Sequence, residues 1–134
     1  MTENVDPLSF LEPDLEILGV VDAGVPNHER IVIRPTRPIS LAGFGITLGV
    51  FVSDDLGAAP LYDNVFWFPD IVIDPPTWLF IYTGPGRVLQ TTVESGEPAL
   101  CLHWQRQYVV FTDPSIVPVL FEIGFARLAK HLGP

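Results

Sequence analysis

Cys101 and His103 are the two side chains whose types and spacing most resemble a catalytic pair. They lie two positions apart in an apolar run, and in a β-strand that spacing places both on one face. A thiolate beside an imidazole is the chemistry of cysteine nucleophiles, but such a cysteine usually meets a histidine from a distant segment. A free cysteine in an apolar run more often packs as a small hydrophobic residue. We therefore predict that Cys101 is structural and that the chain has no catalytic residue.

Carboxylates gather after the predicted third strand, where Asp54, Asp55 and Asp63 could offer oxygen ligands to a cation. A calcium loop needs its oxygen ligands at defined positions, and the alternating acidic pattern of such a loop is absent. The sequence also lacks the HExxH, G-x-S-x-G, glycine-rich phosphate-loop and CxxC motifs. We therefore expect no metal ion and no cofactor, and a protein that is not an enzyme.

Arg30 and Arg34 are the basic residues whose spacing suits recognition. They share one face of a predicted strand, and two guanidinium groups on an exposed face can grip a carboxylate or a phosphate. The alternative is a solvated face on which both arginines pair with local acids. The sequence leaves both interpretations open.

The charge balance excludes several partners. The chain has 134 residues and a formal net charge of −9 at pH 7, with seven Lys and Arg against sixteen Asp and Glu. A nucleic-acid surface needs clustered cations, so we expect no nucleic-acid partner. No apolar run approaches the ~20 residues of a membrane helix, so no membrane span is expected. The first residues do not resemble a secretory signal and the single cysteine cannot form an internal disulfide, so we predict a cytoplasmic protein.

Short strands separated by turn residues run through most of the chain. The central stretch, residues 64–86, carries large apolar residues at two-residue steps and is interrupted by prolines, as in strands joined by proline turns. Seven or more short strands at this spacing predict an antiparallel β-sandwich or barrel. Outside the central stretch, strands are expected at 15–21, 29–34, 39–48 with an extension to 52, 87–93, 99–104, 108–111 and 116–123.

Two terminal segments fall outside the predicted sandwich domain of residues 15–123. Residues 1–14 are acidic, contain two prolines and show no sustained period, so we expect an extended arm. In residues 124–134 the apolar positions follow the i, i+3, i+4, i+7 pattern of an amphipathic helix, which predicts a short C-terminal helix. These positions are Phe125, Leu128, Ala129 and Leu132.

The order of the segments over about residues 27–121 resembles the lamin-tail family of immunoglobulin-like β-sandwiches. Residues 27–33 (NHERIVI) are similar to the family's NEYVEL strand, and residues 39–44 (ISLAGF) are similar to its vdLsGW motif. This sequence has Phe44 where the family usually has tryptophan, and Pro76 where it often has glycine. The likeness continues through residues 66–70 (FWFPD), 75–86, 103–104 and 108–111.

The resemblance implies an immunoglobulin-like antiparallel β-sandwich and a non-catalytic module. Lamin-tail-like domains in bacteria are usually accessories beside nucleases or surface proteins, and a tethering or binding role is proposed for them. No catalytic residue is associated with that fold, so the resemblance carries none over to this chain.

Both faces of the central strands carry large apolar side chains. Trp67 lies on the opposite face of its predicted strand from Phe66 and Phe68. Leu79 and Ile81 lie on the opposite face of theirs from Trp78, Phe80 and Tyr82. An antiparallel sheet normally keeps one face polar, so a second layer, such as the C-terminal helix, or a partner chain must cover this surface. The predicted partner-binding residues are Arg30, Arg34, Trp67, Leu79 and Ile81.

The predicted function is therefore a protein-interaction or structural module in a homo-oligomer or a larger assembly. The net charge of −9 permits a second possibility, an acidic inhibitor or immunity-type protein that docks on a basic partner. A third is a small hydrolase, although no catalytic motif in the sequence supports it.

Overall fold

The computed structural model describes residues 14–133, except for the side chains of Pro60 and residues 62–64. All regular secondary structure in these residues is β-strand, which confirms the predicted all-β class. No helix in the described range is long and apolar enough to cross a membrane. The predicted acidic arm, residues 1–14, lies outside the described residues except for Asp14.

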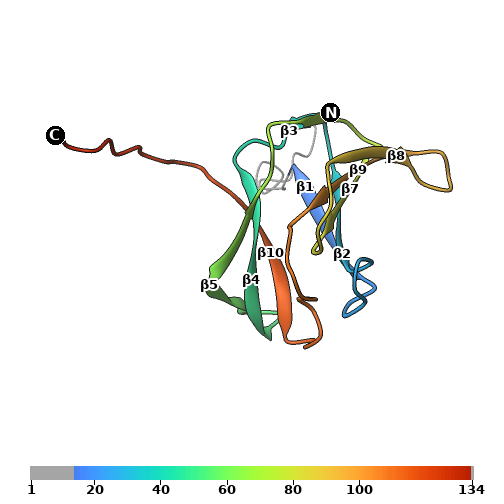
Figure 1. Ribbon diagram of the computed structural model, residues 1–134, viewed down its shortest axis with the longest axis horizontal. Coiled ribbons are helices and arrows are strands. Elements are labelled where there is room, and N and C mark those ends of the chain that lie inside the picture. The colour runs from blue at the N-terminus through green and yellow to red at the C-terminus, as the bar shows by residue number, and fades with distance from the viewer. Residues whose placement is uncertain (1–13, 134) are drawn as a thin grey trace, which may run out of the picture. The chain divides into compact units, whose positions relative to one another are not determined.

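Ten strands follow one another along the described chain (Figure 1). They are β1 (Leu15–Val21), β2 (Arg30–Pro35), β3 (Ile39–Ser40), β4 (Phe44–Ser53), β5 (Gly57–Trp67), β6 (Val72–Ile73), β7 (Trp78–Tyr82), β8 (Leu89–Thr92), β9 (Pro98–His103) and β10 (Ile116–Glu122).

Most of the predicted strands are present, with ends shifted by one or two residues. The single strand expected from residue 39 onward is two strands, because a turn closed by the Phe44 N–H on the Leu41 carbonyl at 3.1 Å interrupts it. Gly43 lies in this turn with φ +86°, a conformation that glycine adopts at little cost. β5 begins at Gly57, before the start of the central stretch predicted from residue 64.

The described strands group into two units. Unit 1 contains the described residues up to Ser40 together with Val72–Asp113, and unit 2 contains Leu41–Ile71 together with the described residues from Pro114 onward. Unit 1 holds a five-stranded sheet in the order β1-β2-β7-β9-β8 and the short pair β3-β6. Unit 2 holds a three-stranded sheet in the order β10-β4-β5.

The sheet of unit 1 is not purely antiparallel, and the sequence prediction is wrong on this point. β7 and β9 run parallel, with Trp78 opposite Ala99 and Tyr82 opposite His103. Parallel neighbours need a crossover of a dozen or more residues, and residues 83–97, which include β8, supply it. The other pairs in this sheet are antiparallel.

The central strands of the unit 1 sheet are buried on one face and partly exposed on the other. Leu79 and Ile81 have no exposed surface, whereas their neighbours Trp78, Phe80 and Tyr82 are half-buried. The assignment of Leu79 and Ile81 to the partner-binding surface is therefore wrong. The buried face is completed by Ile31 and Ile33 of β2 and by Leu100 and Leu102 of β9.

In unit 2, β4 lies between β10 and β5, so both outer strands are edges of the sheet. Pro118 lies in β10, opposite Leu48 of β4. A proline cannot donate a ladder hydrogen bond and is tolerated on an edge strand, so the edge position of β10 suits Pro118. Gly45 lies opposite both Trp67 and Phe121, whose rings meet edge to face with centroids 5.2 Å apart.

The predicted C-terminal helix is absent, and residues 124–133 have no regular secondary structure. Phe125, Leu128 and Leu132 are almost wholly exposed. A helix of this length is unstable in water unless its apolar side packs against something. The spacing of these apolar residues is compatible with an amphipathic helix, but the segment does not form one in this structure.

Gly45 is expected to tolerate no side chain. A Cβ at this position would lie 2.6 Å from the Phe121 ring and 2.8 Å from the Phe66 carbonyl oxygen. Gly45→Ala should therefore lower the free energy of unfolding by about 1–3 kcal/mol, since Phe121 and the β5 backbone must move. Urea unfolding would measure this. The matched control is Gly124→Ala, because a Cβ on Gly124 meets nothing within 4 Å; an equal loss in both variants would contradict the account of Gly45.

Candidate functional site

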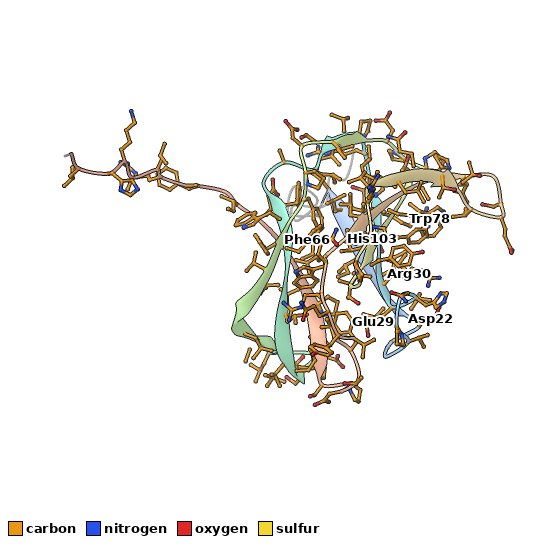
Figure 2. The ribbon with its side chains drawn as sticks, viewed as in Figure 1. Asp22, Glu29, Arg30, Phe66, Trp78 and His103 are labelled. Atoms are coloured by element: carbon orange, nitrogen blue, oxygen red, sulfur yellow. The ribbon has the colours of Figure 1, made fainter. Side chains whose placement is uncertain are left out.

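The partly exposed side of β2, β7 and β9 combines arginine with aromatic side chains. β2 pairs with β7 so that Arg30 lies opposite Tyr82, and β7 pairs with β9 so that Tyr82 lies opposite His103. Alternation along each strand then places every second residue on this side. We call it the Arg–aromatic face (Figure 2). Its members are Arg30, Arg34, Trp78, Phe80, Tyr82 and His103.

The two arginines lie over the aromatic rings of β7. The Arg34 guanidinium is 4.7 Å from the Trp78 ring centroid. That of Arg30 lies between two rings, 5.8 Å from Phe80 and 5.7 Å from Tyr82. The rings of Trp78 and Phe80 are themselves nearly parallel, 9° apart with centroids separated by 6.2 Å. Each contact is a cation–π or stacking interaction that fixes the side chains on an otherwise open face.

Arg30 and Arg34 differ in what holds their guanidinium groups. Arg30 donates to the Asp22 carboxylate at 3.0 Å and to the His28 carbonyl at 2.8 Å. Arg34 is exposed, and it makes no ion pair with any residue in the described part of the chain. Arg30 therefore fits the interpretation of a solvated face paired with local acids. Arg34 keeps guanidinium donors available for a carboxylate.

His103 closes one end of the Arg–aromatic face. Its ring stacks on Tyr82 with centroids 5.2 Å apart and planes 15° apart. Gly86 also approaches this ring so closely that a Cβ there would clash with it. The Gln105 side chain holds Gly86 by bonding both its N–H and its carbonyl. The imidazole is thus clamped in place, and its buried Nδ1 has no hydrogen-bond partner among the described residues.

Cys101 is a buried free thiol on the same side of the sheet, opposite Phe80. Burial raises the pKa of this thiol, and the nearby positive charge of Arg30 only partly offsets the effect. An activated nucleophilic cysteine shows the opposite direction, a lowered pKa. Burial also raises the pKa of Tyr82. The alternation that places Cys101 and His103 on one side is present as predicted, but the thiol has the surroundings of a packed core residue.

A buried carboxylate, Glu29, positions the loops beside the Arg–aromatic face. Its side chain is 1% exposed. Oε1 accepts hydrogen bonds from the Thr83 hydroxyl at 2.6 Å and the Val110 N–H at 2.7 Å. Oε2 accepts hydrogen bonds from the Gly24 N–H at 2.7 Å and the Phe111 N–H at 2.9 Å. Four donors from three separate segments therefore converge on one carboxylate.

These hydrogen bonds set the protonation of Glu29. Burial acts to raise its pKa, but the bonds from Thr83, Val110, Gly24 and Phe111 together hold the pKa below its ordinary value. The sequence analysis singled out no role for this residue. Its only local signal is an acid placed just before a buried strand, and its partners lie 54 to 82 residues away along the chain except for Gly24.

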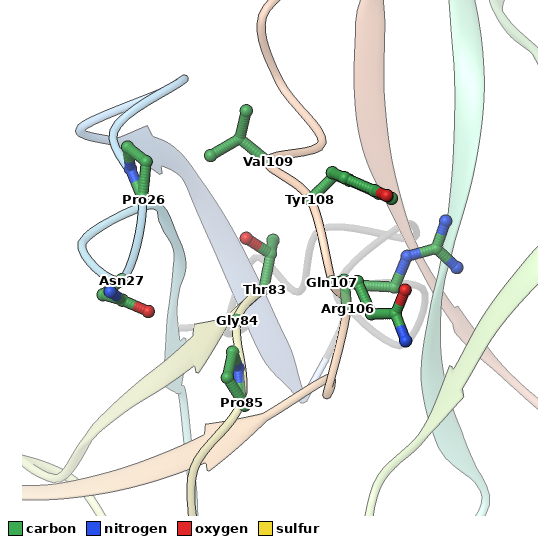
Figure 3. Close-up of a pocket in the computed structure, with 9 residues that line it drawn as sticks. All are labelled: Pro26, Asn27, Thr83, Gly84, Pro85, Arg106, Gln107, Tyr108 and Val109. Carbon is green, nitrogen blue, oxygen red and sulfur yellow. The ribbon is translucent and has the colours of Figure 1, made fainter.

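A hollow of about 240 Å³ lies where the loops tied by Glu29 meet (Figure 3). The β1–β2 turn contributes Pro26 and Asn27, the segment directly after β7 contributes residues 83–85, and the segment 106–109 forms the remaining side. Most of the lining is apolar. The hollow could hold a small apolar side chain of a partner at the end of the Arg–aromatic face.

The remaining predicted site residues are not brought together. Trp67 belongs to unit 2 and is 53% exposed, whereas Arg30 and Arg34 belong to unit 1. Asp54 and Asp55 are exposed in the turn between β4 and β5, and the side chain of Asp63 lies outside the described residues. Among the described residues no cluster of three or more potential metal ligands occurs.

Comparisons with models of protein families, with curated proteins and with solved structures find no match to this chain. The Arg–aromatic face is therefore interpreted from its own geometry.

Glu29→Gln is expected to lower the free energy of unfolding by about 2–4 kcal/mol at neutral pH, because an amide NH₂ would face backbone N–H donors and leave them unpaired. Urea unfolding would measure the loss. Glu94→Gln is the matched control, since Glu94 is exposed and its change should stay within about 0.5 kcal/mol. Similar losses in both variants would contradict the role assigned to Glu29.

The stability of the wild-type protein should also depend on pH through Glu29. Because folding lowers the pKa of this carboxyl, its contribution is fully present above its unfolded pKa, near pH 4, and is lost as the pH falls through the folded value. Unfolding measured from pH 6 down to pH 2 should show this component in wild type and in Glu94→Gln but not in Glu29→Gln. A pH profile unchanged by Glu29→Gln would show that other carboxyls are responsible.

Proposed function

We propose that the chain is a non-catalytic protein-interaction module that recognises a partner protein through the Arg–aromatic face. The observation that carries this proposal is Arg34, whose exposed guanidinium is stacked on Trp78 and has no ion pair in the described part of the chain. Stacking uses the face of the guanidinium and leaves its N–H edges available to an incoming acceptor.

The residue types on this face support a protein partner. Trp, Tyr and Arg are the residues that contribute most to binding energy at protein interfaces. Here they are held before any partner arrives, since stacking fixes Trp78, Arg30 lies across two rings, and Tyr82 and Gly86 both approach the His103 ring closely. A face that is already ordered loses less side-chain entropy on binding. A carboxylate on the partner is the group that best matches Arg34.

The proposal includes an immunoglobulin-like, lamin-tail-like fold. The all-β structure and the order of short strands support it. The proposed fold therefore contains the parallel pair β7–β9 in addition to its antiparallel pairs. The cytoplasmic location stays a prediction from the sequence.

Charge reversal at Arg34 tests the function. A tagged protein would be used to capture partners from a native lysate, in parallel with Arg34→Glu and with Arg87→Glu as the matched control. Arg87 is also exposed, and the change in net charge is the same. A partner held through the Arg–aromatic face should bind Arg34→Glu at least 10-fold more weakly, as expected for a binding hot spot, and should bind Arg87→Glu normally.

Two other outcomes would contradict the proposal. A partner that binds all three proteins equally well does not use this face. A basic partner that is released by salt and is bound more tightly by both charge-reversed variants would instead support the acidic inhibitor, because added negative charge then strengthens the complex.

A further inference from the structure

One side of the unit 2 sheet is apolar and uncovered within this unit. Three rows of side chains run across it: Trp67–Gly45–Phe121, then Val65–Thr47–Val119, then Gly49–Val117. Trp67 and Val65 are exposed, and Phe121, Val119 and Val117 are half-buried. None of these residues carries a charge. We call this surface the Trp67 face, made of Val65, Trp67, Val117, Val119 and Phe121.

A second uncovered apolar surface belongs to the same unit. Residues 124–133, here called the tail, follow directly from β10 and run away from the sheet (Figure 1). Leu128 is 87% exposed, and Phe125 and Leu132 are similarly open. Their i, i+3, i+7 spacing allows one surface to cover all three when the segment is helical. An apolar sheet face and an apolar tail, both open to water, therefore occur in one unit.

The tail is positively charged in a chain whose net charge is negative. The tail contains two of the seven Lys and Arg residues, Arg127 and Lys130, and none of the sixteen Asp and Glu residues. Exposed acids of unit 2 lie near the ends of its strands, at Asp54, Asp55 and Glu122. The tail thus carries the opposite charge to the body of the chain, and the two attract.

The tail also has the size that the Trp67 face requires. Eight residues in a helix extend about 12 Å, and three strands spaced ~4.8 Å apart are about 10–14 Å across. Such a segment can lie across all three strands. Its apolar side would then contact the rows of the Trp67 face, and its cations would lie in the field of a negatively charged body.

The exit of the tail favours a second copy over its own sheet. Ile123 is still held by a hydrogen bond from its N–H to the Gly43 carbonyl at 2.8 Å, and only Gly124 separates it from Phe125. A chain reversal takes about four residues, so a turn back onto the same sheet would use up Phe125. A tail that continues outward keeps every apolar residue free for a neighbouring molecule.

We propose that the Trp67 face of one copy is covered by the tail of a second copy, in a two-fold symmetric dimer with both tails exchanged. Exchange of a terminal segment is a low-cost route to a dimer. The proposal does not depend on the Arg–aromatic face, so Arg34→Glu should leave the dimer intact.

Sedimentation equilibrium of the full chain tests the dimer. The wild-type protein should have twice the mass of the chain, and Leu128→Asp should reduce this mass two-fold at the same concentration. Leu56→Asp is the matched control, because Leu56 is 77% exposed in the β4–β5 turn and receives the same charge; this variant should remain dimeric. A monomeric wild type, or a Leu128→Asp variant that stays dimeric, would overturn the proposal.

A mixing experiment tests the exchange itself. Trp67→Asp damages the face and keeps the tail, whereas Leu128→Asp damages the tail and keeps the face. Each variant alone should be monomeric, with the circular dichroism of the wild type. Their equimolar mixture should form a heterodimer, since one intact tail then meets one intact face. Val65→Asp provides a second face variant if Trp67→Asp fails to fold.

The mixture also separates the proposal from docking within one chain. If the tail covers the face of its own molecule, the wild type is a monomer, its tail resists trypsin at Arg127 and Lys130, and mixing yields no heterodimer. That result would overturn the exchanged dimer. Dimers of Trp67→Asp alone would do the same, because they would show an interface that does not use the Trp67 face.

Discussion

The loops of unit 1 depend on the Glu29 carboxylate. A buried charge is tolerated only when hydrogen bonds replace the water it has lost, and the four donors around Glu29 do this. Three of those donors are backbone N–H groups of segments that form no ladder, so the carboxylate supplies these segments with the hydrogen bonds that a sheet would otherwise provide. Asp22 and Asn27 adopt left-handed conformations, with φ of 55° and 65°, that curl the β1–β2 turn around the carboxylate. Because the next residue is the first of β2, a buried Glu29 also requires Arg30 to point outward.

Because the Arg30 side chain points outward, it can cover the aromatic rings of the Arg–aromatic face, which would otherwise be exposed to water. The aliphatic stems of Arg30 and Arg34 flank Val32, which is nearly buried, and their guanidinium groups cover the rings of β7. Long cationic side chains shield apolar surface in this way while keeping their charge in water. The rings are therefore shielded in the free chain, and a partner meets oriented guanidinium edges rather than bare aromatic surface. Recognition by this face depends on acceptor groups of the partner more than on its hydrophobicity.

Much of the strand pattern could be predicted from the sequence, because two-residue alternation and turn residues are local signals. Which face of β7 is buried could not be predicted, because the residues on both faces are large and mostly apolar. The arginines of the neighbouring strand decide which face is exposed to water. Residues 108–111 have a strand composition but form no strand, because the N–H groups of Val110 and Phe111 bond to Glu29. Of the predicted site, Arg30 and Arg34 do lie together, whereas the stacking of Arg34 and the role of Glu29 depend on contacts between segments distant in sequence. The helical spacing of the apolar residues after Gly124 is a local signal, but spacing alone cannot show whether a surface is present for the helix to pack against.

The distribution of charge constrains how two copies of this chain can meet. Sixteen acids against seven cations make the approach of two bodies unfavourable, and this repulsion extends over about 10 Å at moderate ionic strength. The tail contains two cations and no acid, so a contact through it brings opposite charges together before any apolar surface is buried. The apolar contact with the Trp67 face would then supply most of the affinity, because exposed ion pairs contribute little. Charge would direct the tail to an acidic body, and the uncharged rows of the sheet would determine where on that body it binds.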